Sequence, residues 1–369
     1  MKVIMTCGGT GGHIYPALAI ADEIKKRKPD AEIIFVGSEI GLEKDMVPEN
    51  GYKIELISAD GFNRQHLLKN FEVLRKLRRG SRKSREILRE FKPDVVIGTG
   101  GYASAPIVKA AQKMNIPTFI HEQNAVPGMA NKMLEKHVRN LFLGFGDASK
   151  YFRYPQKHIV SGNPVRQVFK DAGREESRAE LGYGPDDFVL LAFGGSQGAE
   201  RVNKAMTGII EAFSGAENIR ICLATGSYYY EKITQQLHEK GIDTSGNVEI
   251  KEYIYDMAKY LSAADLVICR SGALSVAEAT VCGVPAIFIP SPLVTGNHQY
   301  FNAKAVADKG GAIIIEEKDL DNEGLVQKIS ELRADPQTLK KMTENSYSCA
   351  PLDATEIIYE NIMKSINRE

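Results

Sequence analysis

The sequence predicts an α/β protein with two similar domains, each built on a parallel β-sheet that lies between helices. Eight short apolar runs, rich in β-branched residues, alternate with longer segments whose apolar residues recur at helical spacing. The short runs are continuously apolar, which is typical of strands buried on both faces of a parallel sheet. A strand that leads into a glycine-rich turn occurs at 3–13 and again at 189–199, which indicates that one folding pattern is repeated.

The expected strands form two groups of four. They cover residues 3–5, 33–36, 95–97 and 118–120 in the first group, and residues 189–192, 219–223, 266–268 and 286–289 in the second. Turn-forming residues at 161–166 and 182–186 lie between the groups. We therefore expect one domain over residues 1–163 and a second over residues 164–349.

The end of the chain carries only helical patterns. Pro351 begins a last amphipathic segment that runs to about Ile366, and it follows the second group of strands too late to add another strand. We expect residues 350–369 to include a helix that packs back on the first domain.

Composition excludes several classes of protein. The 369 residues are 43% hydrophobic and 25% charged, which fits a soluble globular protein of two domains and neither a disordered chain nor a coiled coil. Lys and Arg together number 47, as do Asp and Glu, so no net field attracts nucleic acid. Five isolated cysteines favour a reducing cytoplasm. No apolar run approaches the roughly 18 residues of a membrane span, and no signal peptide is expected.

The segment 62–92 differs from the rest because it is strongly basic. It holds eleven Lys or Arg and three Glu, a net charge of +8. The residues at helical spacing within it are Leu67, Phe71 and Leu74 and, less regularly, Ser84, Ile87 and Phe91. The pattern predicts basic helices with an apolar stripe. A solvated helix pair and an RNA-binding patch are the alternatives.

Four glycine-rich loops follow expected strands, at 8–12, 98–106, 194–198 and 270–278. Such loops present backbone N–H groups and a helix N-terminus to an anion, usually a phosphate, at the edge where open α/β sheets bind ligands. None of them spells the dinucleotide fingerprint or the Walker loop. They therefore predict a phosphate-bearing ligand between two domains, of a kind that neither motif identifies.

These loops belong to a longer resemblance. The motifs are GGTGGHIYPALA from Gly8, GGYASAP from Gly100, HEQNAVPG from His121, GNPVR from Gly162, GGSQG from Gly194 and RSGALSVAE from Arg270. In this order they resemble the bacterial UDP-N-acetylglucosamine:undecaprenyl-pyrophosphoryl-muramoyl-pentapeptide N-acetylglucosaminyltransferases, the MurG family. The resemblance implies the GT-B fold, in which two Rossmann-like domains face a cleft.

The resemblance also implies a reaction of peptidoglycan biosynthesis. N-acetylglucosamine passes, with inversion, from UDP-N-acetylglucosamine to the C4 hydroxyl of a muramoyl-pentapeptide carried on undecaprenyl diphosphate. This acceptor gives the segment 62–92 a role, because basic amphipathic helices bind anionic membranes. A peripheral position on the cytoplasmic face of the cell membrane is expected.

The donor is expected mainly on the second domain. The resemblance implies that Arg166 and Ser196 bind the diphosphate, the backbone of Ile254 the uracil, Glu278 the ribose and Gln299 the sugar. Asn302 is expected to bind substrate, and the helix entrance at Ala273, Leu274 and Ser275 to meet the phosphate or uridine oxygens. From the residues alone, Ser275 and Glu278 are instead read as a capping box, and Arg166 as a linker residue.

In the first domain, His13 is the first choice for the base that activates the attacking hydroxyl. It is the one titratable side chain of the loop, next to Thr10, Gly11 and Gly12, which are expected to contact substrate. His121 and Glu122 are the second choice. Asn124 is expected to bond a substrate, and whether these groups polarise or only orient the acceptor stays open.

No metal and no cofactor are expected. The triplet Asp319-Leu-Asp321 has the metal signature of other glycosyltransferases, but it precedes a helical segment and is interpreted as a helix cap. Three other functions remain as alternatives. They are a GT-B transferase acting on a glycerolipid, a sugar-nucleotide epimerase of similar fold, and a non-catalytic UDP-sugar-binding module.

Overall fold

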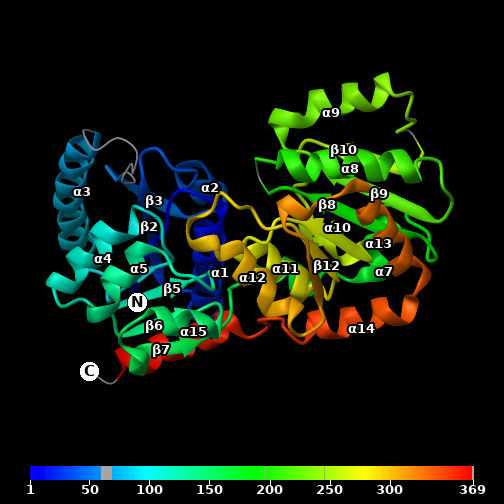
Figure 1. Ribbon diagram of the computed structural model, residues 1–369. Coiled ribbons are helices and arrows are strands. Elements are labelled where there is room, and N and C mark those ends of the chain that lie inside the picture. Colours follow the sequence, from blue (N-terminus) through cyan, green and yellow to red (C-terminus); the bar gives the residue numbers. More distant parts are fainter. Residues whose placement is uncertain (60–68, 196, 245, 368–369) are drawn as a thin grey trace. The chain divides into compact units, whose positions relative to one another are not determined.

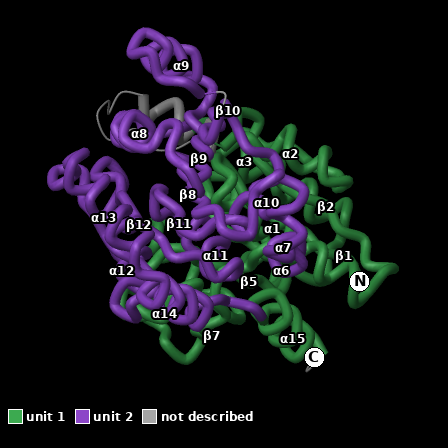
Figure 2. The backbone as a smooth tube through the Cα atoms, turned by 90° about the vertical axis from the view of Figure 1, so that its right-hand side faces the viewer, with its two compact units in different colours: residues 1–166, 353–369 green, residues 167–352 purple. Residues whose placement is uncertain are grey.

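A computed structural model of the chain describes residues 1–59, 69–195, 197–244 and 246–367. The chain divides into two compact units, which are coloured separately in Figure 2. Unit 1 comprises Met1–Arg166 and Asp353–Glu369, and unit 2 comprises Gln167–Leu352.

Unit 1 contains a seven-stranded sheet in the order β3-β2-β1-β4-β5-β6-β7, in which every neighbouring pair is parallel. The strands are β1 (Lys2–Thr6), β2 (Glu32–Ser38), β3 (Lys53–Ile57), β4 (Val95–Gly98), β5 (Thr118–Glu122), β6 (Asn140–Leu143) and β7 (His158–Val160). The helices are α1 (Gly11–Arg27), α2 (Glu43–Glu49), α3 (Lys69–Phe91), α4 (Ser104–Lys113), α5 (Met129–Leu134) and α15 (Ala354–Ile366). Figure 1 labels most of these elements.

Side chains of the central strands alternate between two hydrophobic layers. Val3 and Met5 of β1 pack with α1 and α15 on one face of the sheet, whereas Ile4 packs with α3 and α4 on the other. The last helix, α15, contributes Ile358 and Ile362 to the first layer. Burial on both faces accounts for the continuous apolar runs of these strands.

Unit 2 repeats the pattern with a six-stranded parallel sheet in the order β10-β9-β8-β11-β12-β13. The strands are β8 (Phe188–Phe193), β9 (Ile219–Ala224), β10 (Val248–Lys251), β11 (Leu266–Cys269), β12 (Ala286–Phe288) and β13 (Ala312–Ile314). The helices are α6 (Gln167–Asp171), α7 (Arg174–Glu180), α8 (Glu200–Phe213), α9 (Ser227–Glu239), α10 (Met257–Ala263), α11 (Ala273–Val281), α12 (His298–Ala307), α13 (Asn322–Ala334) and α14 (Pro336–Tyr347).

The predicted fold class is confirmed. All eight expected strands are present, and each sheet follows the Rossmann-like order in which the first strand of the unit lies between the second and the fourth. Both units place their first glycine-rich loop directly after that strand, at the carboxyl edge of the sheet.

The basic segment forms one helix, α3, over its described part, and the second apolar set of the segment packs inward. Ser84 and Ile87 are buried and Phe91 is half-buried, because this side of α3 packs on unit 1 itself. Leu67 lies outside the described residues, as do the side chains of Phe71 and Leu74. The apolar positions that the structure describes therefore face the core.

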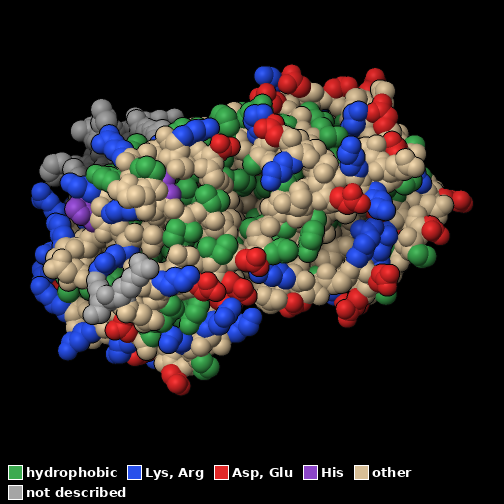
Figure 3. All heavy atoms as spheres, turned by 90° about the horizontal axis from the view of Figure 1, so that it is seen from below, with side chains coloured by type: hydrophobic (Ala, Val, Ile, Leu, Met, Phe, Trp, Pro, Cys, Tyr) green, Lys and Arg blue, Asp and Glu red, His purple; other side chains and the backbone are tan. Residues whose placement is uncertain are grey.

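Basic side chains cover the opposite side of α3. The exposed ones are Arg75, Arg78, Arg79, Arg82, Lys83, Arg85 and Arg89. Figure 3 shows Lys and Arg along the left-hand edge, where α3 lies in Figure 1. In the parts of the chain that the structure describes, no helix is both long and apolar enough to cross a bilayer.

Candidate functional site

The first glycine loop lies between β1 and α1 and touches the loop that follows β4. Gly9 has a φ of +90° and Gly100 a φ of +105°, conformations that favour glycine. A Cβ atom on Gly101 would lie 2.2 Å from the carbonyl oxygen of Gly8, so the two loops approach through their backbones. Thr10 precedes the first helical residue, Gly11, with extended backbone angles. The predicted residues 10–12 thus form the N-terminus of α1.

His13 lies in the first turn of α1, half-buried, with its ring held on two sides. Its Nδ1 atom lies 3.0 Å from the carbonyl oxygen of Gly8. Since a carbonyl only accepts, Nδ1 carries the proton of the neutral ring and Nε2 carries the lone pair. A Cβ on Gly100 would lie 2.7 Å from the ring atom Cδ2, so this glycine makes room for the imidazole. This tautomer leaves Nε2 as the nitrogen that can act as a base.

His121 is fully buried at the end of β5. Its Nε2 atom lies 3.0 Å from the carbonyl oxygen of Gly162 and donates to it, while Nδ1 has no hydrogen-bond partner. Burial lowers the pKa of His121 to about 4, although the hydrogen bond to Gly162 acts in the opposite direction. The ring is therefore neutral near pH 7 and ties β5 to the segment after β7.

Glu122, the next residue, organises the loop that follows β5. Its carboxylate accepts from the backbone and side chain of Asn124, at 3.1 and 3.3 Å, and from the backbone of Gly128 and the side chain of Asn131, at 3.1 and 2.9 Å. Burial raises the pKa of Glu122, and these hydrogen bonds oppose that rise. The carboxylate thereby fixes Asn124 at the carboxyl edge of the sheet.

In unit 2 the loop after β8 is tightly packed against the loop after β9. A Cβ on Gly198 would lie 2.0 Å from the carbonyl oxygen of Thr225, and Gly198 has a φ of +76°. Gly195 also has a positive φ, of +91°. Ser196, the residue expected to bind the diphosphate, lies outside the described residues.

The entrance of α11 carries the predicted residues Ala273, Leu274 and Ser275. The capping-box interpretation is wrong, because α11 begins at Ala273 with Gly272 as its N-cap residue. Ser275 therefore lies inside the first turn rather than before it. Glu278, one turn later, is half-buried and comes from the same side of the helix as Ser275.

Two residues of α12 support this region. Asn302 is fully buried, and its Nδ2 atom donates to the carbonyl oxygen of Ser271 at 3.2 Å. The hydroxyl of Ser271 is buried without a hydrogen-bond partner. Gln299 accepts from the backbone N–H of Ser291 at 2.8 Å. Ile254 is buried in the loop after β10, between the more exposed Tyr253 and Tyr255.

Arg166 is the last residue of the first segment of unit 1, not a residue of unit 2. Its guanidinium lies over the ring of Tyr15 on α1, 4.5 Å from the ring centroid. This cation–π contact holds the guanidinium near the N-terminal part of α1, where the predicted residues His13 and Thr10 also lie. Arg166 is thus a positioned cation of unit 1.

Sequence reasoning missed two residues of the unit 1 site. Tyr15 lies beneath Arg166, and its place within the GGTGGHIY motif was the available signal. Glu43, the first residue of α2, is fully buried and accepts from the backbone N–H of Gly9 at 2.9 Å. No pattern in the chain links two residues 34 positions apart, so only the fold brings them together.

The interpretation of the triplet at 319–321 as a helix cap is confirmed for Asp321. Its carboxylate accepts from the backbone N–H of Gly324 at 2.9 Å, at the start of α13. The described parts of the chain contain no group of three or more His, Cys, Asp or Glu side chains arranged to hold a metal ion.

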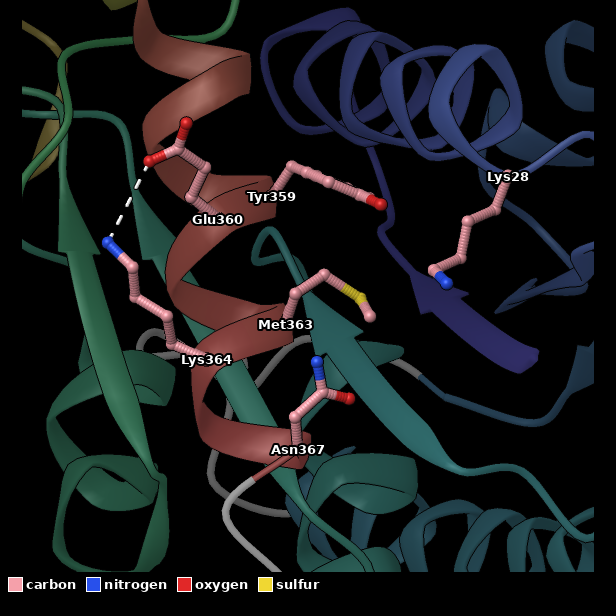
Figure 4. Close-up of a pocket in the computed structure, with 6 residues that line it drawn as sticks. All are labelled: Lys28, Tyr359, Glu360, Met363, Lys364 and Asn367. Atoms are coloured by element: carbon pink, nitrogen blue, oxygen red, sulfur yellow. Dashed lines mark ion pairs between the residues drawn. The ribbon is translucent and has the colours of Figure 1, made fainter.

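One surface hollow of unit 1 lies away from these residues. A hollow of about 590 Å³ lies beside α15, as Figure 4 shows. Its lining residues are Lys28, Tyr359, Glu360, Met363, Lys364 and Asn367. Lys364 is paired with Glu360 at 3.8 Å. None of the predicted site residues contributes to it.

Comparison with known proteins gives matches over nearly the whole chain. Residues 3–143 match the glycosyltransferase family 28 N-terminal domain, and residues 189–358 match the C-terminal domain of the same family. A UDP-N-acetylglucosamine--N-acetylmuramyl-(pentapeptide) pyrophosphoryl-undecaprenol N-acetylglucosamine transferase from Acetivibrio thermocellus is 43% identical, with 99% of this chain and 98% of the relative covered. A transferase of the same name from Thermoanaerobacter sp. is 42% identical, covering 99% and 100%.

Solved structures extend the comparison. The crystal structure of MurG from Acinetobacter baumannii has a TM-score of 0.74 at 30% identity, with 98% of this chain and 99% of that chain covered. A putative UDP-N-acetylglucosamine 2-epimerase from Listeria monocytogenes has the same TM-score of 0.74 at 16% identity, covering 100% and 97%, which shows a shared fold alone. Taken with the two parallel sheets and their glycine loops, these matches show that the chain belongs to glycosyltransferase family 28, in the family of UDP-N-acetylglucosamine--N-acetylmuramyl-(pentapeptide) pyrophosphoryl-undecaprenol N-acetylglucosamine transferases.

Proposed function

We propose that this chain transfers N-acetylglucosamine from UDP-N-acetylglucosamine to a muramoyl-pentapeptide on undecaprenyl diphosphate. The names of relatives about 40% identical over their full length support the donor and the acceptor. The observation that carries the chemistry is the bond between His13 Nδ1 and the Gly8 carbonyl oxygen, because it leaves the lone pair on Nε2. The product is the disaccharide-pentapeptide lipid of peptidoglycan biosynthesis.

In the proposed step the C4 hydroxyl oxygen of the muramoyl group forms a bond to the anomeric carbon of the donor. The bond from that carbon to the diphosphate oxygen breaks, and UDP leaves from the opposite face. The configuration therefore inverts, through a transition state with oxocarbenium character. His13 Nε2 takes the proton of the attacking hydroxyl.

His121 and Glu122 suit a positioning role better than the role of base. Burial holds the His121 ring neutral with a pKa of about 4, and its Nε2 is engaged with Gly162. The two carboxylate oxygens of Glu122 accept four hydrogen bonds from residues that follow it in the chain. We assign to this pair the orientation of Asn124, which binds the acceptor or donor.

The donor is assigned to unit 2. The backbone N–H groups at the entrance of α11, at Ala273 to Ser275, suit a phosphate or uridine oxygen, and the helix dipole favours an anion there. Glu278 accepts from the ribose hydroxyls, Ile254 meets the uracil through its backbone, and Gln299 contacts the sugar. Asn302 is fully buried and supports donor binding through its hydrogen bond to the Ser271 carbonyl oxygen. Ser196 and Arg166 stabilise the charge that develops on the leaving diphosphate.

The protein acts as a peripheral enzyme at the cytoplasmic face of the cell membrane. The exposed basic side of α3 supports this location, because anionic lipids attract clustered Lys and Arg. The acceptor is itself anchored in lipid, so binding the membrane brings enzyme and acceptor together.

The test measures UDP release from UDP-N-acetylglucosamine with and without a muramoyl-pentapeptide lipid acceptor. A transferase releases UDP only when the acceptor is present. An epimerase converts the donor into another UDP-linked sugar without the acceptor, which NMR spectra of the sugar nucleotide detect, and a binding module leaves the donor unchanged. The same assay with a glycerolipid acceptor tests the alternative transferase. UDP release with the glycerolipid would indicate a glycerolipid transferase, and no release would exclude it.

The base is tested with His13→Gln. We expect kcat to fall by about 100-fold or more while the KM for the donor changes little. Full kcat in this variant would contradict the assignment of His13.

The metal-independent step is tested with excess chelator. We expect activity to persist, and strict dependence on a divalent ion would contradict the proposed step.

A further inference from the structure

The carboxylate of Glu43 lies beneath the first glycine loop, shut off from solvent. Its side chain is 0% exposed. One oxygen, Oε1, accepts from the backbone N–H of Ser38 at 2.7 Å, and the other, Oε2, accepts from the backbone N–H of Gly9 at 2.9 Å. A buried carboxylate is costly unless it is hydrogen-bonded, so these two donors fix its place.

The bond to Gly9 acts on the same peptide group that contacts His13. The N–H of Gly9 and the C=O of Gly8 belong to one peptide unit and, in a trans peptide, point in opposite directions. The N–H end donates to Glu43, and the C=O end accepts from His13 Nδ1 at 3.0 Å. The three groups therefore form a chain from carboxylate to peptide to imidazole.

We propose that Glu43 is a positioning residue for the glycosyl transfer, which acts on His13 through the Gly8–Gly9 peptide. The carboxylate fixes that peptide with its carbonyl directed at Nδ1, and by polarising the peptide it makes the carbonyl a stronger acceptor. The ring is thereby locked as the Nδ1–H tautomer, with the lone pair on Nε2. This inference rests on the proposed role of His13 as the base.

The surroundings of Glu43 are built to admit a carboxylate. A Cβ on Gly41 would lie 2.0 Å from Glu43 Oε2, and a Cβ on Gly37 would lie 2.4 Å from Glu43 Cγ. A residue larger than glycine at either position would clash with Glu43 unless the Glu43 side chain moved. Burial, with the charge of Glu43 as a second cause, raises the pKa of the neighbouring Cys7 thiol and keeps it neutral.

The first glycine loop also needs a glycine at position 9. Gly9 has a φ of +90°, and a Cβ added to it would meet nothing within 4 Å, so space does not require glycine there. The backbone conformation does, because side chains other than glycine rarely adopt a φ in this range.

The test replaces the carboxylate with an amide of the same shape, in Glu43→Gln. Both partners of Glu43 are N–H donors, so the amide NH₂ must face one of them and that bond is lost. The readout is the proton position on His13, measured by ¹⁵N spectra of protein labelled at histidine nitrogens and assigned with His13→Gln. We expect the wild type to hold the proton on Nδ1 and Glu43→Gln to show a mixture of tautomers.

Kinetics give a second readout. We expect kcat to fall about tenfold in Glu43→Gln, with the KM for UDP-N-acetylglucosamine changed less than about twofold. The matched control is Glu135→Gln. Glu135 is also buried in unit 1 and accepts from backbone N–H groups of Arg153 and Tyr154, at 2.9 and 2.6 Å, and from His158 at 3.0 Å. Its loss should leave kcat and the His13 tautomer unchanged.

Gly41→Ala is the second variant, for use if Glu43→Gln does not fold. Its methyl group displaces the Glu43 carboxylate, and Glu43 itself is kept. A wild-type His13 with its proton on Nε2, or variants with wild-type tautomer and kcat, would overturn the inference about Glu43. Full activity of His13→Gln would instead contradict the assignment of His13 as the base. The tautomer measurement would still show whether Glu43 controls the proton position on His13.

Discussion

Asn302 Nδ2 donates a 3.2 Å hydrogen bond to the main-chain oxygen of Ser271, and so connects α12 to the turn that opens α11. The Asn302 side chain is fully buried, and the turn leads directly to the backbone N–H groups at Ala273 and Leu274. The position of the proposed nucleotide-binding amides thus depends on a side chain from the next helix along the chain.

Replacing Asn302 with Ala should therefore affect both folding and donor binding. Leaving a buried carbonyl without its partner costs about 1–3 kcal/mol of unfolding free energy. We expect the KM for UDP-N-acetylglucosamine to rise about tenfold as well, measured by steady-state kinetics beside denaturant unfolding. Asn247→Ala is the control, because Asn247 donates to the carbonyl oxygens of Phe213 and Ala216 at a turn after α8. A normal donor KM in Asn302→Ala would contradict this prediction.

Ser275 and Glu278 allow a direct test of the rejected capping box. A Ser that caps a helix contributes about 1 kcal/mol, but Ser275 lies inside α11. Ser275→Ala should therefore change the unfolding free energy by less than about 0.5 kcal/mol. Glu278→Gln should raise the donor KM about tenfold, since a hydrogen bond to a charged group is worth about 1.5–3 kcal/mol. If Ser275→Ala instead lowered the unfolding free energy by about 1 kcal/mol, Ser275 would act as a helix cap after all.

The buried ring of His121 predicts a pH-dependent stability. Burial lowers its pKa from 6.5 to about 4 in the folded chain, so between these values the unfolded chain binds a proton that the folded chain does not. Its contribution is therefore complete above pH 6.5 and is lost as the pH falls through about 4, by about 3 kcal/mol in all.

The measurement is denaturant unfolding at about pH 7 and about pH 4.5, for the wild type and His121→Gln. The variant keeps an N–H donor for Gly162 but cannot be protonated in this range. We expect its unfolding free energy to fall less than that of the wild type on acidification. Equal losses in the two proteins would show that His121 does not titrate on unfolding.

The exposed side of α3 predicts membrane binding driven by charge. Arg78 and Arg79 are exposed, and the apolar side chains described on this helix face the core. Reversing both to Glu should weaken binding to anionic vesicles about 30-fold or more, at about 1 kcal/mol per charge. Binding should also weaken at high salt.

Lys340→Glu with Lys341→Glu is the matched control, since it reverses two exposed charges on α14. Vesicle sedimentation measures both pairs, and donor KM confirms that each variant stays folded. Equal loss in the two pairs would indicate an effect of total charge rather than of α3.

The sequence predicted the interior of each sheet and missed its ends. The strands it identified, such as β1, β4, β8 and β11, have neighbours on both sides and are buried on both faces, so they read as continuous apolar runs. The missed strands are β3, β6, β7, β10 and β13, which lie toward the edges. The edge strand Lys53–Ile57 alternates polar and apolar residues because one of its sides is exposed. Strand β6 differs, because Leu141 to Leu143 form a buried apolar run that was not recognised as a strand.

The same physical limit applies to the site. Glycine loops at strand ends are local features, so the sequence located His13, the α11 entrance and the helix cap at Asp321. The capping box at Ser275 was wrong because the helix boundary is fixed by Gly272, one turn earlier, and by packing from α12. The pattern at Ser84, Ile87 and Phe91 indicated an apolar stripe but not its partner, and Ile87 packs in the core of unit 1, since amphipathicity does not say what covers the apolar face.

By itself, then, the sequence determined the fold class, the glycine loops and the residues that line them, because each depends on neighbours close along the chain. Only the tertiary structure decided that Glu43 accepts a hydrogen bond from the Gly9 backbone and that Arg166 lies over Tyr15. These contacts join residues far apart in sequence. They form when the burial of apolar surface brings the elements together, and no local pattern records their partners.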